Sequence, residues 1–251
     1  MTRGAEAETG MGGTGAGLSG RGIRIAVIDS GVHPDHPHIR ADRLSGGVAF
    51  GKDGHRLDGE DGGWRDRLGH GTAVTAAIQE LAPDADCRSV RVFHDALRTS
   101  GAALIAALEW CAEQRVDLAN LSLGSTNAAH GPLFARAVAR ARAAGVVVVA
   151  AREADGVPCF PGSLPGVLGV GLDWECPRER YRVDAAGFYA SGYPRPIPGV
   201  PRRRNLYGIS FAVAHMTGFA ALACEHLADT ERGEGRTEVV CRWLEARTGP
   251  G

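Results

Sequence analysis

The run IRIAVID, residues 23–29, consists mostly of β-branched apolar residues and ends in an aspartate. Such a run is typical of a strand that is buried on both faces of a parallel sheet. Similar runs follow at 87–93, 116–124, 146–151 and 167–172, and helical patterns occur at 71–81, 101–115, 131–145, 210–228 and 237–247. This alternation predicts an α/β fold with three layers, in which helices cover both faces of a doubly wound, mostly parallel sheet.

The composition limits the class of protein. The 251 residues are 44% hydrophobic and carry a formal net charge of −1, so we expect one large domain and no nucleic-acid partner. Residues 1–20 are expected to be a disordered tail before a single domain at 21–251. The chain shows no secretion signal and no membrane-spanning run, so we expect a cytoplasmic protein without a membrane partner. The six cysteines lack metal or disulfide spacing and are expected to be buried thiols.

Three polar residues occupy strand ends and helix starts, where sheets of this kind bind their ligands. Asp29 ends the first strand, His70 opens the first helix, and Ser210 opens the long helix near the C-terminus. A carboxylate can orient a histidine, which can then take the proton of a serine hydroxyl, so the three residue types suit nucleophilic catalysis. Taken singly, each has an ordinary structural role; Ser210, for example, could simply cap its helix.

Four motifs around these residues resemble those of one family. They are IAVIDSGVHPDHPHI (25–39), GHGTAV (69–74), NLSLGS (120–125) and GISFAVAHMTG (208–218). In this order they are similar to the aspartate, histidine, substrate-binding and serine motifs of the subtilases, the subtilisin-like serine proteases, whose triad order is Asp, His, Ser. The resemblance extends from residue 22 to about residue 228.

The resemblance implies a serine endopeptidase that acts on a peptide or protein substrate. Asp29, His70 and Ser210 would form its catalytic triad. The residues that it implies beside the substrate are Ser122, Leu123, Gly124 and Gly162. It implies no cofactor.

The sequence departs from the family pattern at the oxyanion hole. The family usually has an asparagine donor after the valine-rich strand, whereas this chain reads AAREADGVPCFPG (150–162). An ungapped match places Ala154 there, and a small shift places Arg152 or Glu153 there, with Arg152 as a charged substitute. Loss of the donor costs about 10²–10³ in kcat, a figure measured at the corresponding asparagine of subtilisin itself, so slow turnover is expected. The segment is also short, so one wall of the S1 pocket should be cut back.

Other positions leave alternatives open. His33, His36 and His38 suggest a metal cluster at first sight, but a His-Pro after the aspartate motif is a common feature of the family, and we expect no metal. Ala73 replaces a histidine that is common in the family. The run at 202–204, which comprises Arg202, Arg203 and Arg204, is either a solvated loop or a docking site for an acidic partner.

Three functions fit these observations. The first is an endopeptidase of narrow specificity, such as one that removes a leader from a ribosomally made peptide. The alternative is an inactive or weak pseudoprotease that binds a peptide along residues 120–125 by strand addition, which the missing asparagine favours. Acyl transfer to an amine instead of water is a third, because it would use the same acyl-enzyme.

Overall fold

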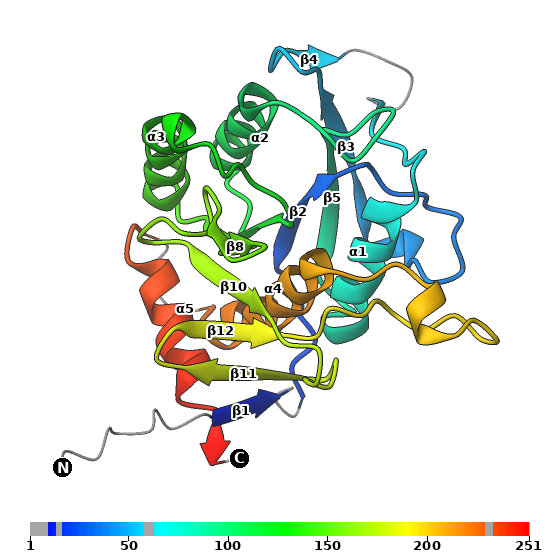
Figure 1. The fold of residues 1–251 in the computed structure, drawn as a ribbon, viewed down its shortest axis with the longest axis vertical. Helices are drawn as coiled ribbons and strands as arrows, with labels where there is room; N and C mark the ends of the chain where they lie inside the picture. Colours follow the sequence, from blue (N-terminus) through cyan, green and yellow to red (C-terminus); the bar gives the residue numbers. More distant parts are fainter. Residues whose placement is uncertain (1–9, 14–16, 58–62, 229–232, 251) are drawn as a thin grey trace.

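The computed structural model describes residues 10–13, 17–57, 63–228 and 233–250. In this part of the chain an eleven-stranded sheet has the order β13-β1-β11-β12-β10-β7-β6-β2-β5-β3-β4 (Figure 1). Its central strands are parallel: β12 (Gly187–Ala190), β10 (Leu168–Leu172), β7 (Val147–Ala151), β6 (Leu118–Leu121), β2 (Arg24–Asp29), β5 (Asp86–Arg91) and β3 (Leu44–Phe50). Antiparallel strands extend both ends: β11 (Arg180–Asp184), β1 (Gly10–Gly13) and β13 (Gly249–Pro250) at one, and β4 (Arg56–Leu57) at the other.

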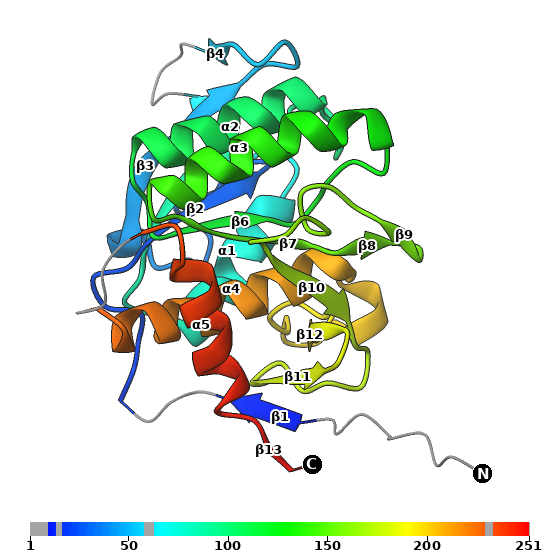
Figure 2. The same cartoon turned by 90° about the vertical axis from the view of Figure 1, so that its left-hand side faces the viewer.

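Helices cover both faces of the sheet. α2 (Gly101–Glu113) and α3 (Gly131–Ala143) lie on one face, and α1 (His70–Leu81), α4 (Ile209–His226) and α5 (Arg236–Glu245) lie on the other (Figure 2). Side chains of β2 alternate between the two cores, since Ile25 and Val27 pack in the core that contains α1 and α4, whereas Ala26 and Ile28 pack in the core that contains α2 and α3. The predicted α/β fold, with a mostly parallel sheet between helical layers, is confirmed.

α4 lies in the middle of one core. All of its residues from Phe211 to Cys224 are buried, so the helix is apolar on every side, as expected for a helix inside a large core. It packs directly against α1, where Gly218 lies against Leu81. The ring of Phe211, in the first turn of α4, lies 5.9 Å from the ring of His70, so the two N-termini, which carry His70 and Ser210, lie close together.

The structure differs from the sequence-based expectations mainly at the edge of the sheet. The prediction of a disordered tail is wrong for Gly10–Gly13, which form β1 and pair with β11; glycine disfavours strands, so the composition gives no sign of this pairing. Residues 1–9 and 14–16 of that tail lie outside the described residues. None of the six cysteines forms a disulfide, and five of them are buried, as predicted. No helix in the described ranges is long and apolar enough to cross a membrane.

Candidate active site

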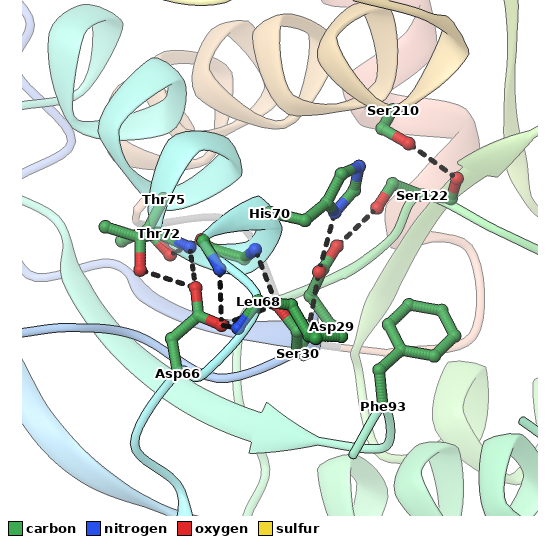
Figure 3. A network of polar contacts seen from close by, with 12 residues as sticks. Asp29, Ser30, Asp66, Leu68, His70, Thr72, Thr75, Phe93, Ser122 and Ser210 are labelled. Atoms are coloured by element: carbon green, nitrogen blue, oxygen red, sulfur yellow. Dashed lines mark hydrogen bonds and ion pairs between the residues drawn. The ribbon is translucent and has the colours of Figure 1, made fainter. Parts of the chain in front are cut away.

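The site is built around the buried carboxylate of Asp29, at the carboxyl end of β2. Its Oδ1 lies 2.7 Å from Nδ1 of His70 and accepts a hydrogen bond from the N–H of Ser30. Its Oδ2 accepts a hydrogen bond from the hydroxyl of Ser122. Because both oxygens of this carboxylate accept hydrogen bonds, Nδ1 of His70 is the donor to Asp29, and Nε2 points to the side where Ser210 lies (Figure 3).

His70 reaches Asp29 because α1 begins very close to the end of β2. A Cβ atom on Gly71 would lie 2.2 Å from the carbonyl oxygen of Gly31 and 3.1 Å from the Cβ of Asp29. Only glycine allows this approach. The glycine after the histidine in GHGTAV therefore determines the distance between the imidazole and the carboxylate.

A second carboxylate, that of Asp66, holds the start of α1. Its Oδ1 accepts hydrogen bonds from the N–H groups of Leu68 and Gly69 and from the hydroxyl of Ser30, and its Oδ2 accepts them from the N–H and the hydroxyl of Thr72 (Figure 3). It takes the place of a capping side chain, which the glycine at the N-cap position lacks. Burial would raise the pKa of Asp66, but the hydrogen bonds from Thr72, Leu68 and Ser30 outweigh it and lower the pKa.

The two carboxylates together change the acidity of His70. Burial lowers the pKa of the imidazole, but the hydrogen bond to Asp29 and the negative charges of Asp29 and Asp66 outweigh this effect and raise the pKa above its ordinary value of 6.5. The imidazolium is therefore stabilised relative to a free histidine. This is what a histidine needs if it is to accept a proton from a serine.

Ser210 lies in the first turn of α4. Gly208, just before the helix, has φ 141°, a conformation that favours glycine and turns the chain sharply into the helix. The hydroxyl of Ser210 donates to the backbone carbonyl of Ser122 at 3.3 Å, and no hydrogen bond among the described residues joins it to His70. Catalytic hydrogen bonds are often unformed without substrate. The N–H of Ser210 has no partner expected within the helix, so with the positive end of α4 it can stabilise an anion.

The chain after β7 makes a tight hairpin. β8 (Glu153–Ala154) pairs with β9 (Val157–Pro158) across a turn of two residues, Asp155 and Gly156, which both have positive φ. The half-buried Ala154 brings no side-chain donor to this wall of the site. The predicted short segment therefore takes the form of a two-stranded ribbon.

Arg152 does not act as a substitute donor in this structure. Its guanidinium donates hydrogen bonds to the hydroxyl of Tyr189 and the carbonyl of Ala186, and it lies 4.8 Å from the centre of the Tyr189 ring. The Tyr189 ring and the Ala186 carbonyl hold the guanidinium of Arg152 beside β12. This position corrects the interpretation that Arg152 reaches the oxyanion hole. The neighbouring Glu153 is exposed in β8.

The predicted substrate-binding segment continues from β6. Leu123 and Gly124 line a cavity of about 890 Å³, together with the first turns of α2. Ser122 lies beside the three candidate triad residues. Its hydroxyl donates a hydrogen bond to Asp29, and its backbone carbonyl accepts one from the hydroxyl of Ser210. Gly162 is not part of this cavity; it packs against the carbonyl of Ala151 and lines a separate cavity with Arg152.

The remaining candidates are the arginine run on the loop between β12 and α4 and the three histidines on the loop after β2. Arg202–Arg204 form an exposed turn of 3-10 helix, and the guanidinium of Arg202 lies 3.6 Å from the centre of the Tyr193 ring. His33, His36 and His38 line a cavity beside α1. No group of three or more His, Cys, Asp or Glu side chains in the described ranges could hold a metal ion.

Sequence reasoning missed Asp66 and Thr72. Their signal is present in the sequence DRLGHGT, because an aspartate shortly before a helix start is typical of a cap. What the sequence does not reveal is that the capping carboxylate also contributes to the pKa of His70.

Comparisons with known proteins identify the family to which the chain is similar. A model of the subtilase family matches residues 20–171. M-protease from Shouchella clausii is 29% identical over 89% of this chain and 62% of its own length, and alkaline elastase YaB from a Bacillus species is 31% identical over 82% and 55%. Subtilisin Savinase from Lederbergia lenta is 30% identical over 82% of this chain and 77% of its own. The chain thus spans less than two thirds of the length of the first two relatives.

Two solved structures share the fold. Sphericase superposes with a TM-score of 0.70 and 23% identity, over 93% of this chain and 84% of its own. A cold-adapted subtilisin-like serine proteinase superposes with a TM-score of 0.65 and 23% identity, over 90% and 82%. The chain therefore has the fold of known structures.

Proposed function

The chain belongs to the subtilase family, and on this basis we propose that it is a serine endopeptidase in which Ser210 is the nucleophile, His70 the general base and Asp29 the residue that orients His70. The 2.7 Å contact between Asp29 Oδ1 and His70 Nδ1, with Ser210 on the Nε2 side of the ring, carries this proposal.

In this mechanism the Ser210 oxygen bonds to the substrate carbonyl carbon while its proton passes to Nε2 of His70. The peptide C–N bond then breaks, and His70 gives the proton to the leaving amine, which leaves an acyl-enzyme. Water repeats the sequence: His70 takes a proton from it, and the new acid leaves as Ser210 regains its proton. The N–H of Ser210 and the positive end of α4 would stabilise the oxyanion.

We further propose that the substrate is one particular peptide or protein, because an oxyanion hole without the asparagine donor suits slow, selective cleavage. Removal of a leader from a ribosomally made peptide is one such reaction. An acidic segment of the partner would dock at the exposed Arg202–Arg204 turn. The six cysteines, none of which forms a disulfide, support a reducing compartment, and we propose the cytoplasm.

The alternative is a pseudoprotease that binds a peptide without cutting it. It is favoured by the hydrogen bond of Ser210 to the Ser122 carbonyl and by the absence of a side-chain donor at Ala154. A folded protein that retained a peptide without cleavage would support this function.

The test is labelling with a fluorophosphonate probe, which requires no knowledge of the substrate. We expect wild type to be labelled and Ser210→Ala and His70→Ala not to be labelled. A folded wild type that takes up no label would refute a working Ser–His pair and favour the pseudoprotease. Product masses then distinguish hydrolysis from acyl transfer to an amine.

A further inference from the structure

A cavity of about 280 Å³ lies beside α1, between the histidine loop that follows β2 and the loop that precedes α4. Its walls include the apolar side chains of Ala73, Ala76, Ile197 and Leu206. The small side chain of Ala73 leaves space that a larger one would fill. The cavity is large enough for one side chain of a bound peptide.

The polar part of the lining is predominantly basic. Three imidazoles, those of His33, His36 and His38, share it with the guanidiniums of Arg67 and Arg195. Among the described residues, the one carboxylate in the lining is that of Asp66, the α1 cap, and its two oxygens already accept five hydrogen bonds. A ligand with an apolar stem and a negative end complements this lining.

The basic groups are held in position before any ligand binds. Arg195 donates from Nη1 to the carbonyl of His38 at 3.2 Å, and its own carbonyl accepts a hydrogen bond from the side chain of Asn205. Glu80, which pairs with Arg178, lies 4.0 Å from Nε of Arg195 in a neighbouring cavity that Arg195 and His38 also line, and Nη2 of Arg195 has no hydrogen bond among the described residues. Arg195 therefore has donor groups available for a ligand in this cavity.

The histidine loop is fixed to α1 in the same way. The N–H of His33 donates to the hydroxyl of Thr72, and the N–H of His38 donates to Nδ1 of His36. A loop whose backbone is already ordered in this way binds a ligand at a lower entropic cost.

The position of the cavity relates it to the leaving group. Thr72, two residues after His70, lines it, and Figure 3 shows Thr72 on the opposite side of the imidazole from Ser122. The acyl part of a substrate would lie along the Ser122 strand, and His70 gives its proton to the leaving amine on the other side. Leu206, just before the nucleophile, completes this side of the cavity.

We propose that this cavity binds an acidic side chain, glutamate or aspartate, from the part of the substrate that lies C-terminal to the cleaved bond. This inference rests on the proposed endopeptidase function. Arg195 and the three histidines would contact the carboxylate, while Ala73 and Leu206 would contact the aliphatic stem.

The experiment is mass-spectrometric profiling of cleavage in a peptide library by wild type, Arg195→Gln, Ala73→Leu and the control Arg136→Gln, which alters an exposed arginine on α3. Wild type should favour an acidic over an amide residue near the cleaved bond, on its C-terminal side, by about tenfold, the effect of one charge-assisted hydrogen bond. Arg195→Gln should lose most of this preference by loss of charge, and Ala73→Leu by loss of space, whereas Arg136→Gln should keep it. Melting curves verify that each variant is folded.

Cleavage by wild type without an acidic preference, or a preference that survives in both cavity variants, would overturn the inference and leave the proposed function intact. If wild type neither cleaves the library nor takes up the fluorophosphonate, the proposed function fails, and the inference fails with it.

Discussion

In Asp66→Asn, one carboxylate oxygen becomes an NH₂ group that faces the N–H and the hydroxyl of Thr72, which lie 2.9 and 2.6 Å from Oδ2. Hydrogen bonds to a charged group contribute about 1.5–3 kcal/mol each, and Asp66 is only half-buried, so we expect the free energy of unfolding to fall by about 3 kcal/mol in total. For a chain of this size, that corresponds to a melting temperature lower by about 6–12 °C.

The same variant should change the pH dependence of Ser210. The negative charge of Asp66 raises the pKa of His70, so its removal lowers that pKa and leaves the imidazole neutral at more acidic pH. The acid limb of the rate of fluorophosphonate labelling should therefore move to lower pH. Asp35→Asn is the matched control, because that carboxylate is 77% exposed on the neighbouring loop and lies 3.8 Å from Arg65. An acid limb that stays in place, or moves to higher pH, in folded Asp66→Asn would refute the role given to Asp66.

Three other predictions concern local packing, the oxyanion wall and the thiols. Gly71→Ala places a methyl group 2.2 Å from the Gly31 carbonyl oxygen, so it should destabilise the fold by about 1–3 kcal/mol and slow fluorophosphonate labelling, which melting curves and labelling rates would measure. Ala154→Asn should raise kcat on a cleaved peptide by up to about 10², and an unchanged kcat would show that residue 154 does not face the oxyanion. Burial raises the pKa of Cys87 and that of Cys241 to about 12, so a coloured disulfide reagent should react slowly with native protein and rapidly after unfolding; rapid reaction before unfolding would contradict this.

The central strands could be predicted from the sequence because both of their faces are buried. β2, β6 and β7 are almost continuously apolar, a pattern that depends little on which neighbours they pair with. β3, with two adjacent glycines, and β11, with its charged residues, carry no such pattern and were not expected. The order of strands in the sheet also depends on contacts between distant segments, which no local pattern contains.

In the site, too, short local motifs could be predicted from the sequence, whereas contacts between distant segments could not. Asp29, His70 and Ser210 could be proposed because each lies in a short motif at the end of a regular element. The position of the Arg152 side chain could not, because its partner Tyr189 is 37 residues further along the chain. The link between Asp66 and the pKa of His70 likewise appears only when the loop before α1 is folded against β2.

The two sides of the proposed reaction centre differ in a way that bears on specificity. On the acyl side, the wall after β7 is a short hairpin without a side-chain donor at Ala154, so less of the barrier can be removed at the reacting carbonyl itself. An enzyme without this donor must obtain more of its transition-state stabilisation from contacts away from the scissile bond. A substrate that lacks those contacts then loses kcat as well as affinity. The basic cavity beside α1 lies on the leaving-group side, where it can supply such contacts. Small acyl substrates with a dye as leaving group cannot fill it, so activity should be sought with peptides that extend well beyond the cleaved bond.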